Sequence, residues 1–338
     1  MNTLAFLNIP GQLQQADGSV FPLVLDHEHT QAGRTELDTW LRSQREGIAA
    51  ALAESGAILF RGFPLDSAED FDAFSAAFGY PDFTYQESLS NAVRINFTPR
   101  VFTANEAPPQ VNIYLHHEMA QTPVSPSKLF FFCRRAAAQG GETPLCRSDL
   151  LFAHIKQEMP AVAQEFKTKG VRYRSRMPAL DDPLSGQGRS WRSTLSVNDT
   201  EAAEAKLRQL GYDWEWLSDG SLIARTPVLP AVRTLSDGSE SFYNQLIAAY
   251  LGWPGVKESP EKFISFGDDT PISPAILHQI AHMAEAFTFD LPWQDGDVAL
   301  VDNYRVMHGR RAYAGDRKRE VLVTLVAGAS ENNGKPSY

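Results

Sequence analysis

The feature that most constrains the fold is a strand pattern that runs directly into two histidines and a glutamate. Val111–Leu115 alternates as a strand, and His116, His117 and Glu118 follow it. Residues i and i+2 of a strand point to one face, so the imidazole of His116 and the carboxylate of Glu118 converge while His117 faces away. A metal site of the 2-His-1-carboxylate type needs one more histidine. The fold must bring a distant segment to this point, as a barrel does.

The third ligand is expected at His308, close to the end of the chain. It ends a strand-like run that begins at Val301. A His-x-Glu triplet such as that of His116 and Glu118 also arises by chance at a polar strand end. A lone histidine such as His308 is often a structural residue. A rival site is formed by His278 and His282, which lie four residues apart on a predicted helix and share a face. That segment lacks the glutamate of a zinc-hydrolase helix, which disfavours it.

An anion anchor is expected close to the metal. Arg319 follows His308 by eleven residues and begins the last predicted strand. A fixed guanidinium there could hold a carboxylate through two hydrogen bonds. Thr143, after the Gly140-Gly141 turn, could add a hydroxyl. Without the metal context, Arg319 would be interpreted as an ordinary charged residue at a strand end, and Thr143 as an ordinary turn residue.

Composition excludes several classes of function. The formal net charge of -10 argues against nonspecific nucleic-acid binding, which needs a basic surface. Two isolated cysteines, Cys133 and Cys146, cannot build a disulfide framework or a cysteine zinc site. The sequence shows no signal peptide and no apolar segment long enough to span a bilayer. We therefore expect a cytoplasmic protein with no membrane and no nucleic-acid partner.

The periodicity predicts one α+β domain over residues 1–338, with many short strands and peripheral helices. Predicted helices cover about 35–54, 67–78, 149–155, 200–210, 245–251 and 273–287. Predicted strands include 57–63, 111–115, 128–133, 143–146, 171–174, 297–302 and 319–326. The irregular segments 81–110 and 177–193 are expected to be functional lids.

Taken together, several stretches resemble the Fe(II)- and 2-oxoglutarate-dependent oxygenases of the taurine dioxygenase (TauD/TfdA) and clavaminate synthase-like family. They are Ile58–Phe63, His116-x-Glu118, Leu129–Phe132, Gly140–Thr143, Asp302–His308 and Arg319. The residues around His116, Trp191 and His308 are most similar to plant clavaminate synthase-like proteins and syringomycin-type amino-acid hydroxylases. The resemblance implies a double-stranded β-helix, or jelly-roll, core with flanking helices.

The resemblance also implies roles for individual residues. The implied iron ligands are His116, Glu118 and His308; the implied contacts to the distal carboxylate of 2-oxoglutarate are Arg319 and Thr143; the implied substrate contact is Asn112. Trp191 and Asn244 are further candidates for substrate contacts, with packing under a loop and helix capping as their respective alternatives. The implied cofactors and cosubstrates are Fe(II), 2-oxoglutarate and O2.

One departure from taurine dioxygenase bears on the substrate. Where that enzyme carries a second arginine for the sulfonate, this chain has Val323. Taurine is therefore not expected as substrate, and another group must meet a substrate anion. The unranked candidates are Arg174, Arg176, Arg189 and Arg192.

The expected reaction is hydroxylation of an unactivated C–H bond of an amino acid or related small acid, free or bound to a carrier protein. Halogenating relatives replace the carboxylate ligand with a small residue, so an intact Glu118 favours hydroxylation. Desaturation or cyclisation by the same family stays open. From another class, a jelly-roll protein that only binds a ligand is the alternative. The sequence leaves oligomeric state open, a homo-oligomer included.

Overall fold

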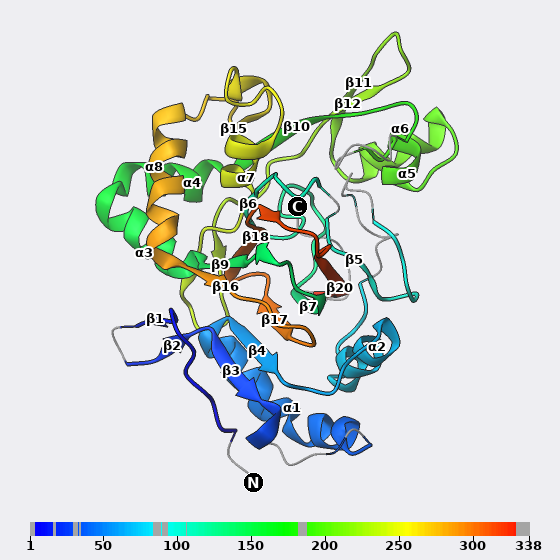
Figure 1. Cartoon of the computed structure of the whole chain (residues 1–338). Helices are drawn as coiled ribbons and strands as arrows, with labels where there is room; N and C mark the ends of the chain where they lie inside the picture. The colour runs from blue at the N-terminus through cyan, green and yellow to red at the C-terminus, as the bar shows by residue number, and fades with distance from the viewer. Residues whose placement is uncertain are drawn as a thin grey trace.

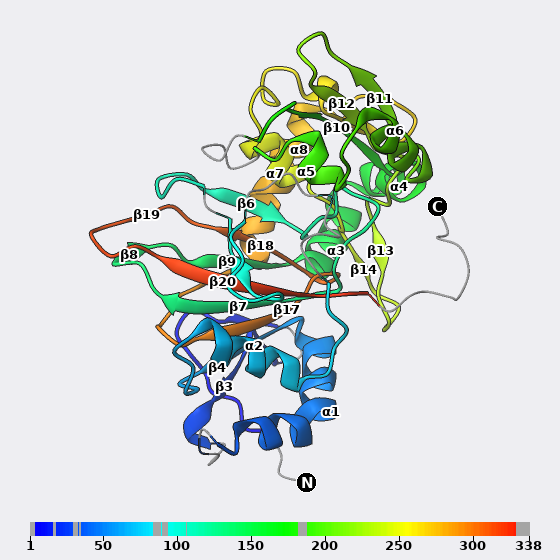
Figure 2. The same cartoon turned by 90° about the vertical axis from the view of Figure 1, so that its right-hand side faces the viewer.

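Two β-sheets face each other at the centre of the molecule, and helices cover their outer sides (Figure 1 and Figure 2). This computed structural model describes residues 4–15, 18–29, 33, 35–83, 89, 94–105, 107–181 and 188–328. Parts of the two expected lids, residues 84–88, 90–93, 106 and 182–187, lie outside the described residues.

The larger central sheet has six strands in the order β3-β4-β17-β7-β20-β5. Their bounds are Leu23–Asp26 (β3), Ala57–Arg61 (β4), Val298–Asp302 (β17), Lys128–Arg135 (β7), Glu320–Val326 (β20) and Phe102–Thr103 (β5). Neighbouring strands are antiparallel except β3 and β4, which are parallel. Strands β17 and β7 are nearly continuous apolar runs because both of their faces are buried.

The smaller central sheet has four antiparallel strands in the order β16-β9-β18-β6. Their bounds are Thr288–Leu291 (β16), Thr143–Arg147 (β9), Val306–Arg310 (β18) and Ile113–His116 (β6). Its inner face packs on the inner face of the larger sheet, which closes the double-stranded β-helix.

Alternation along the strands divides the buried side chains between the inside and the outside of this core. On β7, Phe131 faces inward with Leu145 of β9 and Val306 of β18 in one apolar cluster. Phe130 and Phe132 face outward into a different cluster. The interior of the core is therefore apolar except where the polar side chains of the candidate site lie.

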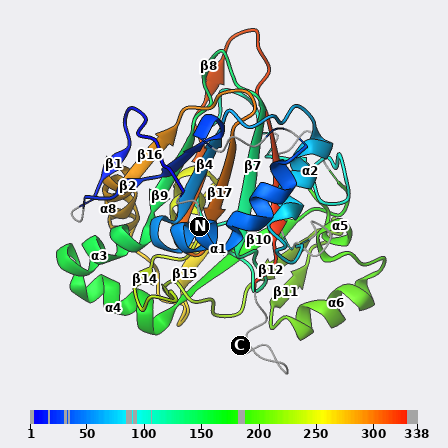
Figure 3. The same ribbon diagram turned by 90° about the horizontal axis from the view of Figure 1, so that it is seen from below.

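Two helices cover the outer face of the larger sheet: α1 (Leu37–Ser55) and α2 (Ala68–Ala77) (Figure 3). Helix α1 ends at Gly56, whose φ of 85° is a left-handed conformation that glycine adopts without strain. Helix α2 begins with a capping box, in which the Ser67 hydroxyl accepts from the Asp70 N–H and the Asp70 carboxylate accepts from the Ser67 N–H.

A long insertion between β9 and β16 builds the rest of the molecule, the upper part in Figure 2. Its helices are α3 (Ser148–Glu158), α4 (Pro160–Lys169), α5 (Trp191–Leu195), α6 (Thr200–Gln209), α7 (Leu246–Gly252) and α8 (Pro274–Ala284). Its sheet has the order β11-β12-β10-β15, formed by Asp213–Trp216, Leu222–Arg225, Val171–Met177 and Ile264–Phe266. Helices α3, α7 and α8 contribute to the cluster that covers the outer face of the smaller sheet.

Short elements complete the described chain. The strand pairs are β1 (Leu13–Gln14) with β2 (Val20–Phe21), β8 (Gln139–Gly140) with β19 (Tyr313–Ala314) and β13 (Arg233–Thr234) with β14 (Glu240–Ser241). The 3-10 helices are His27–His29, Pro260–Lys262 and Glu285–Phe287. No helix within the described ranges has the length and apolar character that crossing a bilayer requires. The predicted α+β class, with a jelly-roll core and flanking helices, is confirmed.

A buried ion cluster fixes the start of β18. Asp149 accepts from Arg147 at 2.7 Å and from Arg305 at 2.6 Å, and Arg147 also donates to the Ser55 carbonyl at the end of α1. Burial alone would raise the pKa of Asp149, but hydrogen bonding to Arg147 and the charges of both arginines hold it below its ordinary value. The cluster joins α1, β9 and β18 at one point.

We expect Asp149→Asn to lower the free energy of unfolding by about 3–5 kcal/mol, because it leaves the buried guanidinium of Arg147 without its anion and leaves Arg305 with only the half-exposed Asp237. Urea denaturation at pH 7 measures the change. The control is Asp38→Asn, which breaks the exposed pair with Arg42 on α1 and should cost no more than about 0.5 kcal/mol. Equal effects of the two substitutions would contradict the role of the cluster.

Candidate metal centre

The two predicted histidine ligands lie opposite each other on paired strands. β6 and β18 run antiparallel, and His308 is the register partner of His116. On β18 the neighbours of His308 show its direction, since Met307 belongs to the outer cluster and Val306 to the inner one. Alternation then places the His308 ring inside the core, where its centroid lies 5.1 Å from that of Phe131.

The three predicted ligands converge on one point. Nε2 of His308 lies 3.4 Å from Oε2 of Glu118, and Nε2 of His116 lies 4.0 Å from the same oxygen. One ligand atom from each of the three residues lies within 4.8 Å of the others. Two imidazole nitrogens and one carboxylate oxygen, supplied from one side, are the donor set of non-heme Fe(II) oxygenase sites. These residues therefore fit the metal that the sequence implies.

The protonation states of two ligands suit metal binding. Burial lowers the pKa of His116 to about 4, and the nearby His308 adds to this effect. Its Nδ1–H donates to the Tyr114 carbonyl at 2.8 Å, which leaves Nε2 as the lone-pair donor. Burial alone would raise the pKa of Glu118, but a hydrogen bond to His308 and the charge of Arg94 lower it to about 2. At pH 7 one group is neutral and the other ionised, as a metal requires.

Glu118 reaches this position through a turn and not through strand alternation, because β6 ends at His116. Asn303 holds the turn: its Oδ1 accepts from the Glu118 N–H at 2.7 Å, and its Nδ2 donates to the Glu118 carbonyl at 3.0 Å. Met119 follows in a left-handed conformation with φ of 59°. A backbone conformation of this kind next to a ligand is a local strain that the surrounding contacts must hold.

His117 points away from the three candidate metal ligands, in agreement with its predicted direction. Its ring is fully buried, its Nδ1–H donates to the Asn303 carbonyl, and it packs on the Tyr243 ring at 4.7 Å between centroids. Burial lowers the pKa of His117 to about 3. The residue is therefore neutral in the folded protein.

The two residues of the predicted anion anchor lie next to each other: Thr143 is buried on β9, and Arg319, partly exposed just before β20, lines a separate cavity of about 350 Å³. Thr143 and Leu145 share a face of β9, and Leu145 is the register partner of His308. Nη2 of Arg319 donates to the Thr143 hydroxyl at 3.3 Å, and its Nε donates to the Gly141 carbonyl at 2.8 Å. Burial lowers the pKa of Arg319 to about 10, which still leaves a cation at pH 7. A Cβ at Gly141 would lie 2.9 Å from Arg319 Cδ, so a glycine allows this approach.

A cavity of about 340 Å³ opens onto two of the metal ligands, His116 and Glu118. Aromatic side chains form much of its wall: Tyr114, Tyr173, Tyr212 and Trp253. Arg94 is the one lysine or arginine among the described residues that line it. Sequence reasoning missed Arg94 because it lies in the irregular segment before β5, where no pattern indicates which way a side chain points.

Arg310 was a second omission of the sequence interpretation. It is buried on β18 two residues beyond His308. Its guanidinium donates to backbone carbonyls of the stretch before β6: Asn105 (3.4 Å), Ala107 (2.8 Å), Pro108 (2.7 Å) and Val111 (2.8 Å). Because these four residues also line the cavity, Arg310 fastens the cavity wall to the strand of the metal ligand.

The three predicted substrate contacts differ in their placement. Asn112 lines the cavity, and its Oδ1 accepts from the Ala312 N–H at 2.7 Å. Asn244 is fully buried, and its Oδ1 accepts from the Leu246 N–H at the first turn of α7 at 3.0 Å. Asn244 precedes Gln245, the N-cap of α7, so this bond supports the turn into the helix without being the cap itself. Asn244 is not among the described residues of the cavity wall.

Trp191 also lies away from the described wall of the cavity. It begins α5, is 2% exposed, and its Nε1–H donates to the Gly220 carbonyl at 3.2 Å. Its ring packs edge-on against Trp216 in the core of the insertion. Packing under its own loop, the alternative role, is what the structure shows.

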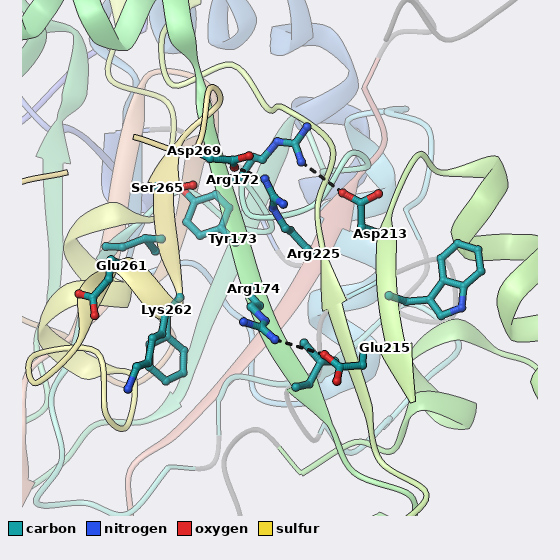
Figure 4. Close-up of a pocket in the computed structure, with 14 residues that line it drawn as sticks. Arg172, Tyr173, Arg174, Asp213, Glu215, Arg225, Glu261, Lys262, Ser265 and Asp269 are labelled. Atoms are coloured by element: carbon teal, nitrogen blue, oxygen red, sulfur yellow. Dashed lines mark hydrogen bonds and ion pairs between the residues drawn. The ribbon is translucent and has the colours of Figure 1, made fainter. Parts of the chain in front are cut away.

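The four arginines considered for a substrate anion are engaged elsewhere. Arg174 lines a separate groove of about 440 Å³ on the outer side of the β10–β12 sheet, where it pairs with Glu215 at 3.5 Å (Figure 4). In the same groove Arg172 pairs with Asp213 at 3.3 Å. Oppositely charged groups alternate there, so no set of like groups converges on a ligand. The other three cations and their partners are Arg176 with Asp219, Arg189 with Ser193 and Arg192 over the Trp191 ring.

The rival pair of histidines belongs to no cluster of metal-ligating side chains in the described part of the chain. His278 and His282 are exposed on α8, as helix-surface residues. Among the residues that the structure describes, the cluster of three or more metal-ligating side chains is that of His116, Glu118 and His308.

Comparisons with known proteins identify relatives of this chain. The family described as taurine catabolism dioxygenase TauD, TfdA family matches residues 22–325. The clavaminate synthase-like protein At3g21360 of Arabidopsis thaliana is 38% identical over 286 residues, which cover 84% of this chain and 86% of that protein. The dapdiamide synthesis protein DdaC of Enterobacter agglomerans is 30% identical over 301 residues, which cover 85% and 87%.

Solved structures show the same fold at low sequence identity. A candidate alpha-ketoglutarate-dependent taurine dioxygenase from Burkholderia xenovorans superimposes with a TM-score of 0.50 and 18% identity. The match covers 85% of this chain and 84% of that one. At this identity the likeness supports the jelly-roll fold and nothing finer.

The neutral, buried state of His117 predicts a pH dependence. An unfolded chain titrates this histidine near 6.5, whereas the fold lowers its pKa to about 3. As the pH falls below 6.5 the unfolded state takes up the proton first, so stability is lost in that direction. Urea denaturation of the metal-free protein from pH 7.5 to 4.5 should therefore show a shallower decline for His117→Gln than for wild type. The control is His278→Gln, at an exposed helix position, and equal slopes for all three proteins would contradict the prediction.

Proposed function

Because the chain belongs to the taurine catabolism dioxygenase TauD, TfdA family, a family of dioxygenases, we propose that it is an Fe(II)- and 2-oxoglutarate-dependent hydroxylase. Its proposed substrate is an amino acid or related small acid, free or bound to a carrier protein. One O2 and one 2-oxoglutarate are consumed, an unactivated C–H bond becomes C–OH, and succinate and CO2 are the coproducts.

The observation that carries this proposal is the convergence of His116, Glu118 and His308 within 4.8 Å, with two of them, His116 and Glu118, lining a cavity. These three residues would hold the iron, and the bound iron supplies the oxidative chemistry. The chain itself keeps the ligands in their metal-binding protonation states and aims them. It does so through the Tyr114 carbonyl behind His116 and through Asn303 behind Glu118.

The cosubstrate is proposed to bind with its distal carboxylate on Arg319 and Thr143. The guanidinium is already fixed by the Gly141 carbonyl, so little side-chain entropy is lost when the anion binds. Trp293 donates to the Thr143 hydroxyl at 2.9 Å, which orients that hydroxyl.

The volume of the cavity supports a small substrate, and the burial of Val323 argues against recognition of a taurine-type sulfonate. A volume of about 340 Å³ lies at the lower end of small-molecule sites. Val323, which stands where taurine dioxygenase has its sulfonate arginine, is 3% exposed in the inner apolar cluster. The proposed acid must therefore be recognised from the cavity wall and not from β20.

Anaerobic mixing with Fe(II) and 2-oxoglutarate tests the proposed activity. Wild type should develop the visible charge-transfer band of an iron–2-oxoglutarate complex, and His308→Ala should not, because one nitrogen ligand is lost. A screen over amino acids should then reveal succinate release that depends on substrate. Absence of the band in wild type would overturn the proposal, and a protein that binds ligands without releasing succinate would be the non-catalytic alternative.

Arg319→Leu removes the proposed anchor of the cosubstrate carboxylate and should weaken 2-oxoglutarate binding by about 10²-fold. This is the expected effect of losing charge-assisted hydrogen bonds worth roughly 3 kcal/mol. The matched control is Arg317→Leu, two residues away, whose exposed side chain pairs with Asp295. Titration of the charge-transfer band measures both affinities. If the two variants lose affinity equally, Arg319 is not the anchor.

A further inference from the structure

Arg94 occupies a fixed position beside the metal ligands. Its side chain is 8% exposed, and its Nη1 donates to the Thr103 carbonyl at 3.2 Å on strand β5. Ile95, the next residue, is bound to Thr103 through two further hydrogen bonds, from the Ile95 N–H to the hydroxyl and from the Thr103 N–H to the Ile95 carbonyl. Thr103 in turn pairs with Leu322 of β20. The guanidinium is thus anchored to the edge of the larger sheet.

The two carboxylate oxygens of Glu118 have different neighbours. Oε2 faces both imidazoles, at 3.4 Å from His308 and 4.0 Å from His116. Oε1 lies 3.8 Å from Nη2 of Arg94. All of these side chains are buried or nearly so, so the electrostatic contrast between the two oxygens is weakly screened by water.

This contrast matters because a carboxylate can bind a metal through one oxygen or through both. A cosubstrate that chelates and an O2 molecule need the open positions that a three-residue donor set leaves. A second oxygen from Glu118 would take one of those positions. A cation held against Oε1 opposes that outcome, since it attracts this oxygen and repels a metal ion on the same side.

We propose that Arg94 is a positioning residue that keeps Oε1 of Glu118 from binding the metal. Glu118 then binds the metal through Oε2 alone, and the cosubstrate position stays open. The inference rests on the proposed function for the identity of the cosubstrate. The inference that Glu118 binds through one oxygen does not depend on the cosubstrate and applies to any divalent ion at this site.

The test separates metal affinity from cosubstrate affinity in Arg94→Gln. Anaerobic Co(II) titration of the metal-free protein, followed by its visible absorption, should give an affinity within about threefold of wild type or tighter. Binding of 2-oxoglutarate to the Co(II) protein should weaken by about 10- to 100-fold, the range for loss of a residue that orients a metal ligand. Arg94→Lys keeps the charge and should restore part of that loss.

The matched control is Arg100→Gln, which removes an arginine from the same segment. Arg100 pairs with Asp72 and Asp82, away from the metal ligands, so both affinities should stay at the wild-type values. Unfolding midpoints verify that all variants are folded, and Arg94→Met, which keeps the apolar stem and removes the charge, serves as the test protein if Arg94→Gln is not.

Two results would overturn the inference. One is unchanged 2-oxoglutarate affinity in Arg94→Gln, including the case in which only a substrate amino acid binds more weakly. The other is an equal loss of Co(II) and 2-oxoglutarate affinity. Failure of the proposed function gives a different result, because wild type would then bind Co(II) but not 2-oxoglutarate.

Discussion

The pairing of β6 with β18 is the constraint on which the rest of the structure depends. It places His116 opposite His308 on the inner face of the smaller sheet, although nearly two hundred residues separate them in the chain. A shift of one residue would turn one imidazole to the outer face. Gly309 permits the pairing, since a Cβ there would lie 2.4 Å from the Ile113 carbonyl oxygen. The buried ion pair of Arg305 with Asp149 fixes the start of β18 in the same register.

The three residues of the candidate metal centre could be predicted from the sequence because their chemistry is encoded locally. A strand that leads into His116-x-Glu118 and a late histidine after another strand leave few alternatives for a 2-His-1-carboxylate site. The longer elements were also predictable: the 35–54 and 67–78 helices and the apolar strand at 128–133 coincide with α1, α2 and β7 within a few residues. Their periodicity reflects a buried face that the fold preserves.

What the sequence could not supply depends on tertiary contacts. The segment 177–193 was predicted as a loop, but Ser190 caps the short helix α5 and carries Trp191 into a separate core. Asn303 and Arg94 follow no periodic pattern, and their importance comes from the ligand that each contacts. An irregular segment gives no indication of side-chain direction, so the cation beside Glu118 becomes visible only when β5 is placed against β20.

The candidate site is therefore a donor set aimed by its surroundings: two histidines by strand register, and Glu118 by Asn303 and Arg94. A crystal structure of the anaerobic complex with Fe(II) and 2-oxoglutarate tests this most directly. We predict one iron ion bound by the two imidazoles and a single oxygen of Glu118, with the distal carboxylate of 2-oxoglutarate on Arg319. Iron bound elsewhere, or a cosubstrate carboxylate away from Arg319, would contradict it.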